Sequence, residues 1–204
     1  NIIKKDIPNQ ITSSYLHVSR RPLNLAMGYS TSTPYKLSHG LLDFYRTTYG
    51  NLTVNDILDR ITLPEQQKNI LKKNAQQYFP SMNSIFSDSD KPKLAALLQQ
   101  NASTIYAALK ENYDAVIGYL EQESLFSNRN SAIIDLGWAG TLQYSINKIL
   151  HSCGSENKVS GFYYGLSNPS LRNHYRAGRM LSAFGCGFST FEHHVHLRNG
   201  VDIF

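Results

Sequence analysis

The nine residues from Asp135 to Gln143, DLGWAGTLQ, bring a carboxylate, two glycines, a hydroxyl and an indole into one short stretch. The apolar run over residues 131–135 predicts a parallel strand buried on both faces, and the amphipathic pattern over 141–151 predicts a helix. Ligands of open α/β sheets bind outside the carboxyl ends of the strands, where we expect Asp135 to lie. The sequence therefore predicts a functional loop between this strand and this helix.

Each residue of the loop has an expected role. Gly137 and Gly140 permit tight backbone geometry and close approach by a ligand. The amides of Gly140 and Thr141 would open the helix, whose N-terminus attracts anions, and the Thr141 hydroxyl could bind a phosphate oxygen or cap the helix. Asp135 can accept hydrogen bonds from sugar hydroxyls or hold Mg²⁺ through water, and Mg²⁺ is the only cofactor that these residues suggest.

Trp138, the only tryptophan of the chain, could stack on a ligand ring, and Gln143 completes the set of candidate ligand-binding residues. The alternative is a structural turn in which Trp138 is a hydrophobic plug. The stretch matches neither the G-x-G-x-x-G fingerprint nor a phosphate loop ending in Gly-Lys-Ser/Thr. No catalytic residue can be assigned from the sequence.

A second candidate site follows the pattern SYLHVS over residues 14–19, which predicts a short buried strand. Ser19, Arg20 and Arg21 come at its end, and arginine forks match phosphates bidentately. If this strand neighbours the strand that contains Ile133, both loops face one cleft. The alternative is a surface turn with two solvated charges.

A third candidate is the sequence HHVH over residues 193–196. On a strand, His194 and His196 would share one face, and two neutral imidazoles could bind Zn²⁺ or Ni²⁺. No Cys, His or Asp pattern completes such a site. We therefore expect no metal there, and His194 and His196 are only weak candidates.

Around these motifs the sequence predicts an α/β fold, a mainly parallel Rossmann-like sheet with a large helical insertion. Residues 1–36 and 126–204 would form the α/β core, with further strands over 158–166, 181–184 and 191–197. Residues 37–125 would form a helical cap, with helix starts at Ser38, at Thr53 with Asp56, and at Pro64. One long helix would follow residues 88–90 and carry an apolar stripe from Leu94 to Leu120.

Bulk properties exclude several classes of protein. The net charge of +5 favours anionic partners weakly, and the absence of Lys/Arg runs argues against nucleic acid. No apolar stretch approaches the ~20 residues of a membrane span, and no signal peptide is present, so we expect a cytoplasmic protein. Cys153 and Cys186 are too few for a disulfide framework, and whether they pair is open. The chain begins without Met and stops in apparent mid-element, so we expect a fragment.

The order of these segments resembles the C-terminal region of large bacterial proteins described as predicted haloacid-dehalogenase (HAD) superfamily hydrolases, which are associated with surface-polysaccharide or glycosyl-transfer machinery. The resemblance rests on YLHVSRR over 15–21, IIDLGWAGTLQ over 133–143 and GFYYG over 161–165. It covers most of the chain, and its second segment is fairly specific. In such proteins the phosphatase motifs lie upstream, and this chain lacks their D-x-D signature. The resemblance implies a partner domain beside an upstream HAD-like domain of the same polypeptide.

The chain is also distantly similar to type I phosphoribosyltransferases. They place a basic pyrophosphate loop after an early strand and an acidic, Gly/Thr-containing loop after a later one. Arg20 and Arg21 precede Asp135 and Thr141 in that order. Those enzymes usually show two adjacent acids, whereas Leu136 follows Asp135 here.

Together these features predict a phosphosugar- or nucleotide-binding α/β module of a larger protein of bacterial glycan metabolism. The alternative, from another class, is a non-catalytic protein-interaction domain that uses the helical block. The sequence leaves the substrate, the reaction and the oligomeric state open.

Overall fold

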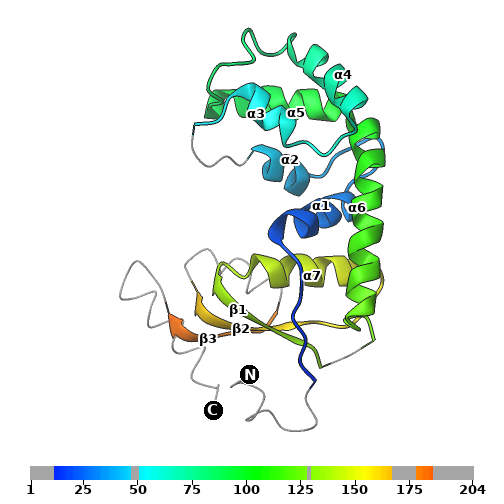
Figure 1. Cartoon of the computed structure of the whole chain (residues 1–204), viewed down its shortest axis with the longest axis vertical. Coiled ribbons are helices and arrows are strands. Elements are labelled where there is room, and N and C mark those ends of the chain that lie inside the picture. Colours follow the sequence, from blue (N-terminus) through cyan, green and yellow to red (C-terminus); the bar gives the residue numbers. More distant parts are fainter. Residues whose placement is uncertain (1–11, 47–50, 128–129, 167–177, 186–204) are drawn as a thin grey trace.

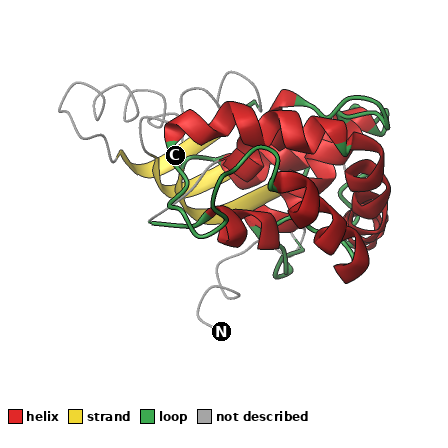
Figure 2. Cartoon of the chain, turned by 90° about the horizontal axis from the view of Figure 1, so that it is seen from above, coloured by secondary structure: helices red, strands yellow, loops and turns green. Residues whose placement is uncertain are grey.

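In a computed structural model, the described part of the chain comprises residues 12–46, 51–127, 130–166 and 178–185. Helices predominate, and a small parallel sheet lies at one end of the molecule (Figure 1). Seen from above, the helices lie over the strands (Figure 2). The chain therefore has the mixed α/β character that the sequence predicts.

The elements follow one another in three groups. An N-terminal helix and a helical block come first: α1 (Arg20–Ser30), α2 (His39–Arg46), α3 (Val54–Asp59), α4 (Glu65–Ala75), the 3-10 turn η2 (Asp88–Asp90), α5 (Lys91–Gln100) and α6 (Ala102–Gln122). The sheet and its crossover helix follow: β1 (Ala132–Trp138), α7 (Thr141–Ser152), β2 (Ser160–Leu166) and β3 (Met180–Gly185). Residues 37–125 are mainly helical where they are described, although the connections over 60–64 and 76–87 are not helical.

Local capping explains several helix starts. The Thr53 hydroxyl accepts the Asp56 N–H at 3.2 Å, and the Asp56 carboxylate accepts the Thr53 N–H at 2.8 Å, which completes a capping box. The Ser38 hydroxyl accepts the Leu41 N–H at 3.2 Å. Both predicted caps are therefore confirmed. The predicted end of α7 is confirmed too, because Gly154 follows the C-cap residue Cys153 with a φ of +77°.

The long helix predicted after residues 88–90 is in fact two helices. Asn101 separates α5 from α6 with φ −102° and ψ 21°, and its side-chain amide donates to the Leu97 carbonyl at 2.8 Å. Asparagine ends helices readily because its side chain offers the backbone an alternative hydrogen bond. The apolar stripe is nevertheless core along both helices.

Two hydrophobic cores share the long helix α6. Its first half contributes Ile105 and Leu109 to a core inside the helical block. Its second half contributes Val116 and Leu120 to a core shared with α1, α7 and Val159. Figure 1 shows α6 running beside both parts of the molecule. The domain boundaries at 36/37 and 125/126 stay a prediction.

The three strands are parallel and lie in the order β1-β2-β3. The helix α7 connects β1 to β2, which is the βαβ unit that the sequence predicts. On the opposite face of β1, Ile134 is 88% exposed and Leu136 is 78% exposed. The prediction of a strand buried on both faces is therefore wrong for the part of the chain that the structure describes, which covers only one face of β1.

The prediction of a strand over residues 14–19 is also wrong. This segment is an extended stretch outside the sheet, and β1 has β2 as its neighbour among the described strands. The segment lies along α6, where the Ser14 hydroxyl donates to the Glu123 carboxylate at 3.0 Å and the His17 N–H donates to the Tyr119 hydroxyl at 2.6 Å. Its alternating pattern comes from Leu16 and Val18 packing against the second core.

The remaining predicted strands have different outcomes. The strands over 158–166 and 181–184 are confirmed as β2 and β3. The strand over 191–197 lies outside the described residues, as do His194, His196 and Cys186.

Candidate functional site

Asp135 lies inside β1 rather than at its carboxyl end. The strand continues to Trp138, and Asp135 pairs with Tyr163 of β2. The predicted loop therefore shrinks to Ala139 and Gly140, although the Asp135 carboxylate still accepts the Gly137 N–H at 3.3 Å. The expectation that the strand ends at Asp135 is wrong, because the strand pairing continues through Gly137 to Trp138.

Gly137 makes this continuation possible. It has a φ of +121° and pairs with Gly165, and a Cβ at Gly137 would overlap the Gly165 carbonyl oxygen. Close approach does occur at this glycine, as the sequence suggests, but the approaching group is the backbone of β2. The side chain of Trp138 lies outside the described atoms, so its stacking role stays a prediction.

Gly140 sets the start of α7. It occupies the N-cap position in the left-handed region, with a φ of +66°. A Cβ there would lie 2.5 Å from the Met180 side chain and 3.4 Å from the Tyr163 hydroxyl. Only glycine fits both the backbone conformation and the space, so the N-terminus of α7 is held against β2 and β3.

Gln143 is a structural clamp. Its side chain is fully buried, and its amide donates to the carbonyls of Val159 and Arg179, both at 2.9 Å. Its Oε1 accepts the Tyr163 hydroxyl at 2.9 Å. A Cβ at Gly161 would overlap this oxygen, so the glycine leaves room for the clamp. Because both N–H groups and the oxygen of the amide are engaged, the structure gives Gln143 a positioning role rather than the predicted ligand contact.

Two further polar residues of this region were missed by the sequence reasoning. The Asn147 amide donates to the Val159 carbonyl at 3.0 Å and accepts the Val159 N–H at 2.8 Å. Burial, and secondly the negative charge of Asp135, raise the pKa of Tyr163 above its ordinary value. The available signal was the presence of Gln143 and Asn147, four residues apart, on the apolar face of a predicted amphipathic helix.

The backbone N–H groups in the first turn of α7 donate to no side-chain cap within the described part of the chain. The Thr141 hydroxyl is buried and has no hydrogen-bond partner among the described residues. An uncapped helix N-terminus carries unsatisfied N–H groups and a partial positive charge. The Thr141 hydroxyl, which is unpaired among the described residues, therefore lies at the N-terminal end of α7, and the partial positive charge of this end suits an anion.

The basic residues lie on a helix rather than after a strand. Arg20 and Arg21 form the start of α1, and Ser19 occupies its N-cap position without a side-chain hydrogen bond. The Arg21 guanidinium donates to the Arg60 carbonyl at 2.7 Å, so this side chain is held by the helical block. Arg20 is exposed. Of the two arginines, Arg20 is the better candidate for a ligand contact.

The packing of α1 against α7 determines where Arg20 lies relative to Thr141. The helices α1 and α7 contact each other, and the Ser145 hydroxyl donates to the Asn24 side-chain oxygen at 3.0 Å. These are the fifth residues of their helices, and both helices begin on the same side of the molecule in Figure 1. Arg20 and Thr141 therefore lie at the same end of this helix pair.

Among the described residues, a metal site would require a cluster of ligating side chains, and a membrane span would require a long apolar helix. In these ranges no group of three or more His, Cys, Asp or Glu side chains is placed to hold a metal ion. Nor does any helix in the same ranges have the length and apolar character needed to cross a membrane. The Cys153 thiol is exposed and shares a hydrogen bond of 3.2 Å with the Tyr113 hydroxyl, and it forms no disulfide within the described residues.

Comparison of the chain with family models, with curated proteins and with solved structures finds no match.

Proposed function

We propose that this domain binds a phosphorylated sugar or a nucleotide, with a phosphate group at the first turn of α7. The observation that carries the proposal is the buried Thr141 hydroxyl, which has no partner within the described residues and lies at a helix N-terminus without a side-chain cap. Buried hydroxyls are normally hydrogen-bonded, so an acceptor oxygen of a ligand would satisfy the Thr141 hydroxyl in this position.

Three interactions would hold the phosphate. The N-terminus of α7 contributes roughly 0.3–1 kcal/mol when exposed and up to ~2 kcal/mol when partly buried. The Thr141 hydroxyl would donate one hydrogen bond to a phosphate oxygen. Arg20, at the same end of the α1–α7 pair, would add a charge-assisted bond of about 1.5–3 kcal/mol.

The rest of the site favours a sugar phosphate over free phosphate. Asp135 faces Tyr163 and is half-buried, and a carboxylate there repels a bare anion. It could instead accept hydrogen bonds from sugar hydroxyls or bridge to the phosphate through Mg²⁺. As part of the same proposal, the sheet belongs to a Rossmann-like module of a larger HAD-like protein of bacterial glycan metabolism.

Calorimetry on the whole chain tests this function. The ligands are glucose 1-phosphate, a nucleotide sugar and phosphoribosyl pyrophosphate, each with and without Mg²⁺, and inorganic phosphate. We expect a sugar phosphate to bind more tightly than inorganic phosphate. Thr141→Val, which removes the hydroxyl and keeps the shape, should weaken binding about tenfold.

The controls separate this site from general charge effects. Arg20→Ala should weaken binding, whereas Arg46→Ala should leave it unchanged, because Arg46 pairs with Asp43 in the helical block. If no phosphorylated ligand binds, or if Thr141→Val and Arg20→Ala both leave affinity unchanged, the proposal fails. The alternative, an interaction domain that uses the helical block, would then take its place.

A further inference from the structure

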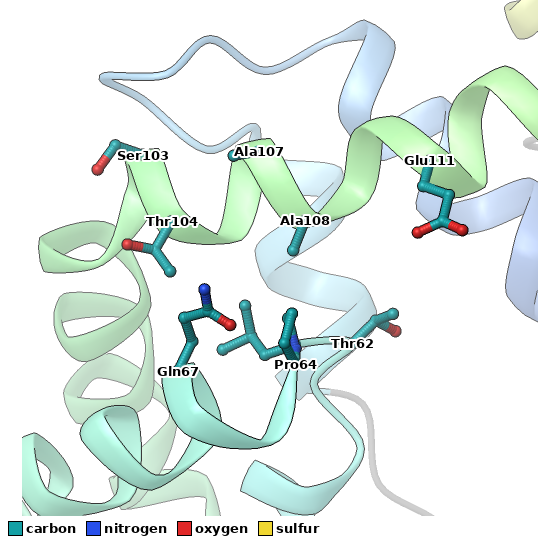
Figure 3. A pocket seen from close by; sticks show the side chains of 9 residues that line it. Thr62, Pro64, Gln67, Ser103, Thr104, Ala107, Ala108 and Glu111 are labelled. Carbon is teal, nitrogen blue, oxygen red and sulfur yellow. The ribbon is translucent and has the colours of Figure 1, made fainter.

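The helical block contains a groove whose lining includes no residue of α7. It runs between the start of α4 and one face of α6 (Figure 3). Its volume is about 820 Å³, within the usual range for ligand sites. Nine residues line it, and they come from the turn before α4, which includes Thr62, from α4 itself and from α6.

The groove is open because α6 presents small side chains to it. Ser103, Thr104, Ala107 and Ala108 form two turns of that face, and the turn before α4 supplies Leu63 and Pro64. From Ser103 to Glu111 the face is about 12 Å long at 1.5 Å per residue. That length matches three to four residues of extended chain, at about 3.3 Å each.

One hydrogen-bond acceptor of the groove has no partner. The Gln67 amide extends from α4 towards α6 in Figure 3. Its Oε1 is shielded from water and accepts no hydrogen bond from the described residues. A buried carbonyl without a donor is costly, so a ligand N–H that reaches it on a small side-chain shift would be favoured.

The charge of the lining is one-sided. Glu111 is exposed and has no ion-pair partner in the described part of the chain, while its neighbour Lys110 pairs with Asp114 at 2.5 Å. No Lys or Arg is among the nine lining residues. The groove therefore disfavours phosphates and carboxylates and favours a cation near Glu111.

The lining also lacks aromatic rings, on which sugar rings and bases commonly stack. Its hydroxyls and amide alternate with small apolar groups, which suits a peptide main chain with small side chains. We propose that this groove binds an extended peptide segment of a partner protein, with small residues over Ala107 and Ala108 and a Lys or Arg paired with Glu111. This site is independent of the phosphate site proposed at α7.

The test is an NMR titration of the whole ¹⁵N-labelled chain with two tetrapeptides, acetyl-Ala-Ala-Ala-Lys-amide and acetyl-Lys-Ala-Ala-Ala-amide, at millimolar concentrations. The amides of Thr104, Ala107 and Ala108 and the Gln67 side-chain amide should shift. The variant Ala107→Leu, at an exposed position of α6, should abolish these shifts by filling the groove.

Charge variants decide between specific and general binding. Glu111→Gln should weaken the lysine peptides about two- to fivefold, the effect of one exposed ion pair. Glu121→Gln, also on α6 but outside the groove, should have no effect. The proposal is overturned if neither lysine peptide shifts these signals, if acetyl-Ala-Ala-Ala-Glu-amide shifts them equally, or if glucose 1-phosphate binds in the groove instead.

Discussion

The Tyr163 hydroxyl donates a hydrogen bond of 2.9 Å to Oε1 of Gln143, so the middle strand of the sheet is tied to the first turn of α7. The same glutamine amide donates to the carbonyls that precede β2 and β3. The first turn of the helix is therefore held at a fixed height above the sheet. This positions Gly140 and Thr141, the residues at which we propose that phosphate binds.

Gln143→Ala should destabilise the protein strongly. It leaves the Tyr163 hydroxyl without its acceptor and opens a cavity beside α7, which together cost about 2–5 kcal/mol. The Val159 and Arg179 carbonyls lose one hydrogen bond each but keep those from the Asn147 amide and the Gly161 N–H. Gln66→Ala, at an exposed position of α4, should change the free energy of unfolding by less than about 0.5 kcal/mol. Urea unfolding of both variants measures the difference, and equal values would contradict the clamp.

Gly161→Ala and Gly118→Ala should act in opposite directions. A Cβ at Gly161 would overlap the Gln143 side chain, so this variant should cost about 1–3 kcal/mol. A Cβ at Gly118 meets nothing within 4 Å and lies inside α6, where alanine is preferred by about 1 kcal/mol. Thermal unfolding of the pair provides the check: a melting temperature that rises in Gly161→Ala would refute the close packing inferred here.

Stability should fall in alkaline solution as buried tyrosines ionise. Burial raises the pKa of Tyr163 above its ordinary value of 10.0 and raises the pKa of Tyr45 to about 12. The folded state then keeps phenolic protons that the unfolded state releases. The stabilisation is complete below pH 10 and is lost as the pH rises through the folded-state pKa values.

The variant Tyr163→Phe isolates one of these tyrosines. It should reduce the decrease of unfolding free energy between pH 9 and pH 11, measured in urea, relative to the unmodified chain. Tyr35→Phe serves as the control, since Tyr35 is 90% exposed. An unchanged pH slope in Tyr163→Phe would show that this hydroxyl does not hold its proton more tightly in the folded state.

Shortening an apolar side chain should be costly in the core between α7 and the sheet and nearly neutral on the exposed face of β1. Ile149 of α7 is fully buried in the second core, and Ile149→Ala should cost about 2–5 kcal/mol. Ile134 is 88% exposed, so Ile134→Ala should cost less than about 0.5 kcal/mol. Chemical unfolding of both variants tests this contrast. A large loss in Ile134→Ala would mean that something covers that face.

Short-range signals made much of the fold predictable. The capping box at Thr53 and Asp56, the cap at Ser38 and the glycine at 154 act within a few residues, and the structure contains all three. The βαβ unit was recognisable because a strand pattern, a helix pattern and a second strand pattern followed one another. Such features depend on local chemistry that one chain segment carries by itself.

The errors came from long-range contacts. The pattern at residues 14–19 alternates like a strand, but its apolar side chains pack against α6 and its neighbours instead of joining the sheet. The glycine at 137 suggests that the strand ends at Asp135, whereas Gly137 pairs with Gly165 and the strand continues. The role of Gln143 depends on Tyr163, Val159 and Arg179, which no local pattern connects to it.

The most direct test of the central claim is the response of the first-turn amides of α7 to a phosphorylated sugar. Glucose 1-phosphate would be titrated into the ¹⁵N-labelled chain while the N–H signals of Gly140, Thr141 and Leu142 are followed, with glucose as the uncharged control. We predict that these signals shift with the phosphorylated sugar, do not shift with glucose, and shift less in Thr141→Val. Signals that stay unchanged in the unmodified chain at saturating concentrations would contradict a phosphate site at α7.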